Sequence, residues 1–292
     1  MPFAASTAEG AAAIRAAGTT ERDPRLRGPD RLAARFVGSR LKPTALVKVP
    51  LLRRLAPRLA ERLVPGSYWF ELARVKHMDA LLREALAAGT RQLVILGAGF
   101  DTRAYRFADQ LAGVATFEVD HPITASIKRA RVEELFGRLP AHVRYVELDF
   151  NGGDLTGALR AAGYRQDLPA FVIWSGVTAY LEPLGVDAVL RWFAGSAPGS
   201  SIVFDYAYRE AVEGDDSFHG AAELRRRVAQ GGEPLRFGIP RGTGARFVGE
   251  RGLELLSDLP PDELRARYLV GSDGQLGGSP YGFVSIAHAR VA

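Results

Sequence analysis

Two glycines and a following acid mark where this chain could do chemistry. Residues 93–96 form a short apolar run that ends at Gly97-Ala98-Gly99. Glycines at such a position let the backbone approach a ligand closely, because they carry no Cβ atom. A second apolar run ends at Asp120, about twenty residues further on, where an acid can accept hydrogen bonds from ribose hydroxyls. The spacing predicts a nucleoside-containing cofactor at the carboxyl edge of a parallel sheet.

The residues around the glycines indicate which cofactor this would be. A dinucleotide fingerprint needs a third glycine three residues after the second, and this chain has Thr102 there. Asp101 would repel a pyrophosphate, whereas S-adenosylmethionine has no phosphate and carries a positive sulfonium. Four acids fall at or just beyond the ends of predicted strands: Asp101, Glu118, Asp120 and Asp149. The charge pattern therefore favours S-adenosylmethionine over the nicotinamide cofactor of a dehydrogenase.

The elements that must position these residues alternate between strand and helix patterns. We predict parallel strands over residues 93–96, 115–119, 144–148, 170–174 and 201–206. Helical patterns cover residues 68–86, 123–136, 155–162 and 186–193. This order predicts an α/β fold with a doubly wound, Rossmann-like sheet and right-handed helical crossovers.

The two ends of the chain depart from this alternation. Prolines at positions 43, 50, 57 and 65 predict that the helices of the N-terminal part are short. The polar, glycine-rich stretch from 207 to 245 predicts a helical insertion suited to a lid. Residues 247–256 resemble a helix, and two strands, 267–270 and 281–291, are expected to form an antiparallel hairpin at one sheet edge.

These patterns divide the chain into four parts. We predict a helical N-terminal cap (1–66), a cofactor-binding Rossmann-like core (67–206), the insertion or lid (207–245) and C-terminal strands that complete the core sheet (246–292).

Composition narrows the classes of protein that this chain could be. Of its 292 residues 47% are hydrophobic, which is enough for one sizeable core. The net charge of +5 comes from arginines spread along the chain, so no nucleic-acid partner is expected. There is no cysteine, no apolar run long enough to cross a membrane and no secretion signal, so we expect a cytoplasmic protein. No pair of histidines has the spacing of metal ligands, and no metal is expected.

Several short motifs occur together in a characteristic order. They are Leu72-Ala73-Arg74-Val75, Leu96-Gly97-Ala98-Gly99-Phe100-Asp101-Thr102-Arg103, Phe117-Glu118-Val119-Asp120-His121-Pro122, Val146-Glu147-Leu148-Asp149-Phe150 and Trp174-Ser175-Gly176-Val177-Thr178-Ala179-Tyr180-Leu181. With these motifs the chain resembles the leucine carboxyl methyltransferase family of S-adenosylmethionine-dependent O-methyltransferases, in particular its bacterial small-molecule and polyketide branch. The resemblance implies the seven-stranded methyltransferase sheet and covers residues of about 70 to 206.

The resemblance also implies roles at the cofactor. Arg74 would hold the methionine carboxylate, a bidentate contact that a guanidinium suits. The backbone of Gly97, Ala98 and Gly99 would lie against the methionine and the ribose. Asp120 would bind the ribose hydroxyls.

Further contacts would complete the cofactor site. Glu118 would shape the strand end before Asp120, and Asp101 would cap the next helix beside the cofactor. Asp149 would accept a hydrogen bond from the adenine amino group, and Phe150 would cover the ring. One departure concerns the methionine end, where the family usually has Glu and this chain has Ser175. In the cap, a family Lys corresponds to Ala34.

The acceptor of the methyl group is less specified. A carboxylate acceptor needs no base, whereas a hydroxyl needs one, and the candidates are Tyr180, Tyr206, Tyr208 and His219. We expect a small-molecule acceptor, such as a polyketide-like secondary metabolite, and leave a homodimer open. Two alternatives stay open: methylation of a protein C-terminal carboxylate, and a non-methylating protein or catalyst that binds S-adenosylmethionine.

Overall fold

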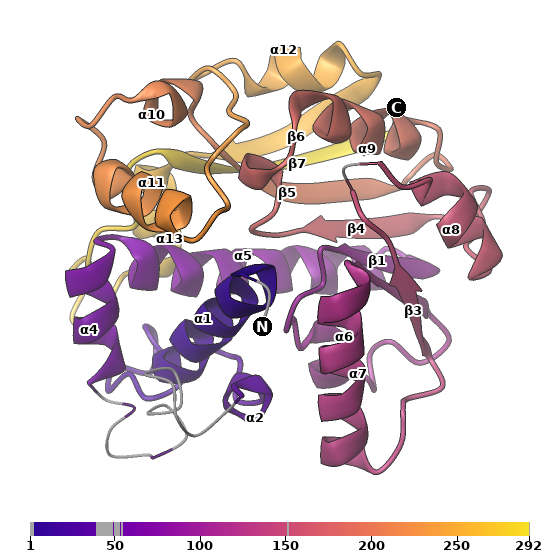
Figure 1. Cartoon of the computed structure of the whole chain (residues 1–292), viewed down its shortest axis with the longest axis horizontal. Coiled ribbons are helices and arrows are strands. Elements are labelled where there is room, and N and C mark those ends of the chain that lie inside the picture. Colours follow the sequence, from indigo (N-terminus) through magenta and orange to yellow (C-terminus); the bar gives the residue numbers. More distant parts are fainter. Residues whose placement is uncertain (1–2, 39–48, 50–52, 54, 151, 292) are drawn as a thin grey trace.

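A single mixed sheet forms the centre of the molecule (Figure 1). The structure is a computed structural model that describes residues 3–38, 49, 53, 55–150 and 152–291. Seven strands lie in the order β3-β2-β1-β4-β5-β7-β6. Their bounds are β1 Gln92–Leu96, β2 Ala115–Asp120, β3 Val143–Glu147, β4 Ala170–Trp174, β5 Ser201–Ala207, β6 Leu253–Leu259 and β7 Val284–Val291. The predicted fold class is confirmed.

The first five strands run parallel, so their carboxyl ends meet at one edge of the sheet. β1 and β4 are buried along their whole length, as expected of central strands covered on both faces. Ala98 N–H, just after β1, donates to the Val119 carbonyl of β2 at 3.0 Å. Leu148 N–H, just after β3, donates to the Asp120 carbonyl at 2.8 Å. The segments that follow the strands are therefore tied together at this edge.

Helices cover the sheet on both sides. They are α1 Phe3–Gly18, α2 Ala33–Phe36, α4 Ala56–Leu63, α5 Ser67–Ala87, α6 Arg103–Arg106, α7 Pro122–Phe136, α8 Leu155–Ala161, α9 Pro183–Ala194, α10 Arg209–Glu213, α11 Ala221–Gln230, α12 Gly244–Gly249 and α13 Pro261–Tyr268, with a 3-10 helix η2 at Thr178–Tyr180. The long helix α5 packs on β4 and β5, and α9 lies on the opposite side of the strands (Figure 1). The helix α1 crosses α5 and packs on it.

The parallel half of the sheet agrees with the sequence predictions, and its strand ends differ from them by one residue at most. Helix α5 is also where the 68–86 pattern placed it. The stretch 207–245, predicted to be a helical insertion, contains α10, α11 and the start of α12. In the N-terminal part, α1 is longer than predicted, with 16 residues, because it precedes all four prolines. Pro43 and Pro50 lie outside the described residues, and Pro57 is in the first turn of α4.

The predictions for the last fifty residues were partly wrong. The predicted strand 267–270 starts inside α13, and the predicted helix 247–256 ends with α12 at Gly249 before β6 begins. Pro261 in the first turn of α13, followed by two acids, is a helix start that was overlooked. The antiparallel pair at the sheet edge does exist, but β6 and β7 form it. No helix among the described residues is long and apolar enough to cross a membrane.

Candidate active site

The loop after β1 has a backbone that requires glycine. Gly97 has a φ of 62°, and a Cβ atom placed there would lie 2.3 Å from Val177 Cγ2. A side chain at this position would therefore clash with the loop that follows β4. Gly99 also has a positive φ, and a Cβ there would lie 3.1 Å from the Ala8 side chain of α1. The glycine loop thus lies between the β4 loop and the N-terminal helix.

Asp120 ends β2 beside this loop. One of its carboxylate oxygens accepts a short hydrogen bond from Gly99 N–H, and the other accepts from His121 N–H at 2.7 Å. Burial raises the pKa of Asp120, although these two backbone donors act in the opposite direction. Each carboxylate oxygen can accept more than one hydrogen bond, so the group can still receive a ligand hydroxyl.

Glu118 has a different environment from Asp120. Its carboxylate is fully buried and accepts from Lys128 Nζ at 2.8 Å and from the Tyr105 hydroxyl at 2.9 Å. Burial raises the pKa of Glu118, and Lys128 opposes this shift. Lys128 also donates to the Ala98 carbonyl at 3.3 Å. Glu118 therefore acts on the glycine loop through Lys128, a residue that the sequence did not single out.

Asp101 lies at the start of α6. It accepts from Arg103 N–H at 2.7 Å and forms a short ion pair with the Arg103 guanidinium. Burial alone would raise the pKa of Asp101, but Arg103, Lys128 and Arg15 together bring it well below its usual range. Asp101 is thus an ionised carboxylate beside the glycine loop.

Asp149 and Phe150 follow β3 at the same edge. The Asp149 side chain is exposed, and its carbonyl accepts from Gly153 N–H at 2.8 Å. Phe150 is half-buried. Since Leu148 is tied to Asp120, these two residues lie beyond the end of β2, on the far side of Asp120 from the glycine loop.

Arg74, on α5, lies at the opposite end of the candidate site from Asp149 and Phe150. Its Nη1 donates to Asp205 at 2.8 Å, and its Nη2 forms a short ion pair with Glu71. Burial works against the charge of Arg74, but these two carboxylates outweigh it and raise the arginine's pKa. The Arg74 Nε atom is buried and has no hydrogen-bond partner among the described residues. A buried N–H without a hydrogen-bond partner is unfavourable, so this donor has the capacity to bond one further acceptor.

The ion pair between Arg74 and Asp205 belongs to a longer buried network. Arg15 of α1 pairs with Glu71 at 3.2 Å and with Asp30 at 2.9 Å. The network continues through Arg106 to Asp79, and from Arg103 to Asp101. No side chain in it is more than 13% exposed. The network therefore joins the glycine loop to the Arg74 end beneath α1.

The segment after β4 brings Ser175 and Tyr180 to the Arg74 end. Ser175 is half-buried, and its neighbour Gly176 donates its N–H to Asp205 at 2.6 Å. Burial, and then the nearby Glu233, raise the pKa of Tyr180 to about 12, while Arg74 opposes the shift. Tyr180 therefore keeps its proton at neutral pH.

Tyr281 also belongs to this end, and the sequence did not identify it. Burial, then Tyr180, raises its pKa, whereas Arg74 acts to lower it. Its ring lies 5.4 Å from that of Phe70 on α5. The sequence gave no specific signal for Tyr281, because it precedes β7 in a turn far along the chain from Arg74.

Tyr206 and His219 are not brought together with Arg74. Successive strand residues point to opposite faces, so Tyr206 faces away from the side where Asp205 meets Arg74. Its buried hydroxyl donates to Asp258 at 2.6 Å, and its ring lies 6.2 Å from that of Tyr208. His219 is exposed between α10 and α11.

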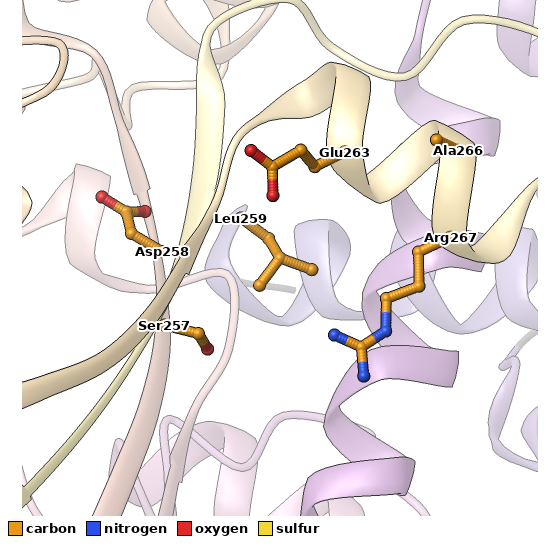
Figure 2. Close-up of a pocket in the computed structure, with 6 residues that line it drawn as sticks. All are labelled: Ser257, Asp258, Leu259, Glu263, Ala266 and Arg267. Atoms are coloured by element: carbon orange, nitrogen blue, oxygen red, sulfur yellow. The ribbon is translucent and has the colours of Figure 1, made fainter.

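A surface hollow lies between β6 and α13, and neither the glycine loop nor Arg74 lines it (Figure 2). It has a volume of about 590 Å³ and is lined by Ser257, Asp258, Leu259, Glu263, Ala266 and Arg267. Figure 2 shows Asp258 turned to the far side of the strand from Leu259. Within the described parts of the chain, no group of three or more His, Asp or Glu residues is arranged to hold a metal ion.

Comparison with known proteins identifies the family. The model of the leucine carboxyl methyltransferase family matches residues 8–194. A Bacillus subtilis protein, "Putative S-adenosyl-L-methionine-dependent methyltransferase YktD", is 28% identical over 194 residues, which are 66% of this chain and 64% of YktD. A Mycolicibacterium smegmatis protein, also named a putative S-adenosyl-L-methionine-dependent methyltransferase, is 35% identical over 76% of this chain and 73% of its own length. This chain belongs to the leucine carboxyl methyltransferase family, as its motifs predicted.

The relatives also extend beyond the matched region. The matches span 64% of YktD and 56% of a Mycobacterium avium relative that is 37% identical.

Among solved structures, a DUF574 family protein from Streptomyces avermitilis aligns with a TM-score of 0.57 at 16% identity, over 89% of this chain and 97% of that one. A Thermobifida fusca structure gives the same TM-score at 18% identity. These two structures share the fold.

Proposed function

We propose that this chain is an S-adenosylmethionine-dependent methyltransferase that methylates an oxygen atom of a small molecule. The observation that carries the proposal is the arrangement at the ends of β1 and β2. There the Asp120 carboxylate is held by backbone N–H groups next to a glycine loop that excludes side chains. Family membership and the names of the relatives support the same cofactor.

The residues fit this cofactor in three respects. The glycine loop gives a close backbone approach, since a Cβ at Gly97 would meet Val177. The buried Arg74 Nε atom is an unpaired donor suited to a carboxylate. Asp120 is an acceptor suited to ribose hydroxyls. When bound, the cofactor supplies a methyl group that its sulfonium has already activated.

Each end of the cofactor would have its own set of residues. Arg74 would hold the methionine carboxylate, with Ser175 beside it, and the backbone of Gly97, Ala98 and Gly99 would lie against the methionine and ribose. Asp149 and Phe150 would contact the adenine. Glu118 and Asp101 would act by fixing the loop, since Lys128 and Arg103 occupy their carboxylates.

The acceptor would lie beside Tyr180, Tyr281 and Phe70. Tyr180 keeps its proton at neutral pH, because its pKa is raised to about 12. It would therefore orient an acceptor by donating a hydrogen bond, and would not remove a proton from it. The aromatic rings favour a flat or apolar molecule. Aligning the acceptor oxygen and excluding water can lower the barrier by roughly 7–11 kcal/mol.

The test is turnover of the purified chain with S-adenosylmethionine across a panel of small carboxylates, phenols, alcohols, amines and peptides with a free C-terminus. We expect S-adenosylhomocysteine to form with small carboxylates or hydroxyl compounds, and the methyl group to be found on oxygen. Turnover restricted to peptides would move the assignment to a protein carboxyl methyltransferase. Cofactor binding without any turnover would favour a non-methylating protein.

A further inference from the structure

The buried ion network of the site has one more carboxylate than it has arginines. Among the described residues it contains four guanidiniums, of Arg15, Arg74, Arg103 and Arg106. Its five carboxylates are those of Asp30, Glu71, Asp79, Asp101 and Asp205. A buried charge without a counter-charge is unfavourable, so the network is suited to receive one cation.

The position of the excess charge follows from how the carboxylates are paired. Glu71, Asp30 and Asp79 each lie within 4.0 Å of two guanidiniums. Asp101 forms an ion pair with one guanidinium, that of Arg103, and the positive charges of Lys128 and Arg15 also lower its pKa. Within the part of the chain that the structure describes, Asp205 forms an ion pair with Arg74 alone, at 2.8 Å, and its second oxygen accepts from Gly176 N–H at 2.6 Å. Asp205 is therefore the carboxylate of the network with the least positive charge around it.

Asp205 also lies at the end of β5, beside the loop that follows β4. β4 and β5 pair in parallel up to Trp174 and Phe204, and Gly176 of that loop donates its N–H to Asp205 at 2.6 Å. The carboxylate at this end of the site thus comes from β5, and it projects toward Arg74 and the loop after β4.

We propose that Asp205 receives the α-ammonium group of the methionine portion of the cofactor. The assignment rests on the proposed function. Arg74 and Asp205 would then recognise the carboxylate and the ammonium of one amino acid side by side, each group already oriented by the other.

The first experiment uses the unmodified protein and isothermal titration calorimetry. It compares S-adenosylhomocysteine with its analogue that lacks only the amino group. We expect the analogue to bind about tenfold more weakly or worse, because a buried charge-assisted hydrogen bond is lost. Equal affinities would overturn the role of Asp205. If S-adenosylhomocysteine itself fails to bind, the proposed function fails as well, which is a different result.

The second experiment repeats the comparison in Asp205→Asn. We expect the two ligands to bind this variant with nearly equal affinity, because the charge that distinguished them is gone. The matched control is Asp258→Asn, which changes a carboxylate outside the network that accepts from the hydroxyls of Tyr206 and Ser285, and should keep the tenfold preference. A preference that persists in Asp205→Asn would contradict the proposal. If this variant does not fold, the ligand comparison on the unmodified protein decides.

Discussion

The nucleoside end and the amino-acid end of the candidate site are built by different means. At the nucleoside end, neighbouring backbone groups hold Asp120, and the residues involved lie close together in the sequence. At the amino-acid end, side chains hold one another, and Arg74 meets Asp205 across 131 positions of the chain. The first arrangement needs only two neighbouring strands and the glycine loop that follows one of them. The second needs the whole fold, because it depends on α1, α5, β4 and β5 together.

Because of this difference, mutations at the two ends should have different effects on stability and on ligand affinity. Removing a side chain from a backbone-held site leaves the surrounding N–H groups accessible to ligand or water. Removing one partner from a buried ion network leaves another charge without compensation. We therefore expect the amino-acid end to couple ligand binding to stability, and the nucleoside end to affect mainly affinity.

The largest effect should come from Glu71→Gln, which removes the carboxylate that both Arg15 and Arg74 share. We expect the free energy of unfolding to fall by about 3–5 kcal/mol, because two buried guanidiniums lose a partner. Urea denaturation measures this. As a control, Glu254→Gln breaks the half-exposed pair with Arg290 and should cost no more than about 1 kcal/mol. Similar losses in both variants would show that the buried network contributes no more to stability than an exposed ion pair does.

At the nucleoside end, Asp120→Ala should weaken binding of S-adenosylhomocysteine by about 1–3 kcal/mol, because the ribose loses a charged acceptor. Calorimetry gives the affinity, and thermal melting should show a smaller change than in the Glu71 variant. Asp154→Ala, at the exposed start of α8, serves as the control and should bind normally. Unchanged affinity in Asp120→Ala would remove this residue from the site.

His77 lies one turn after Arg74 on α5. It is buried as a neutral side chain, in contrast to the buried ionised side chains of the network. Burial lowers its pKa from 6.5 to about 4, with Arg267 and His288 adding to the shift. The unfolded chain therefore binds a proton more readily than the folded one, and stability is lost as the pH falls from 6.5 toward 4. At pH 5 this loss is about 2 kcal/mol for one such histidine. Urea denaturation at pH 7 and pH 5 should show a smaller pH effect in His77→Gln; an undiminished effect would place the acid sensitivity elsewhere.

The smallest effect is expected for Ser175→Ala. If Asp205 supplies the carboxylate at this end, the hydroxyl of Ser175 contributes little, and affinity for S-adenosylhomocysteine should change by less than about 0.5 kcal/mol. A loss as large as that of Asp120→Ala would mean that Ser175 itself binds the ligand. Calorimetry under the same conditions allows this comparison.

The predictability of the two ends differs for the same physical reason. Strands β1, β2 and β4 are short apolar runs that end in glycine or acid, so the sequence revealed them together with Gly97, Gly99 and Asp120. Arg15 and Tyr281 gave no such signal, because their partners are distant in the chain, and Lys128 gave none although Glu118 is only 10 positions away. Arg74 was identified through the family resemblance, but its partners were not.

The edge of the sheet shows a related difficulty. Strand β6 lies at the edge and is buried only in part, so it lacks the continuous apolar run that marks β1. The predicted strand 267–270 was apolar only at its end, and its first two residues belong to α13. Tyr206 was proposed for its place at the end of β5, but the pleat turns it toward Asp258. One residue of register decides which face a side chain reaches.

The proposed function requires that the carboxyl ends of β1 and β2 hold the nucleoside of S-adenosylmethionine. The most direct measurement is a crystal structure of the chain with S-adenosylhomocysteine. We expect the ribose hydroxyls within hydrogen-bond distance of Asp120, and the sulfur next to the loop of Gly97 and Gly99. A ligand bound elsewhere, or Asp120 turned away from it, would contradict the claim.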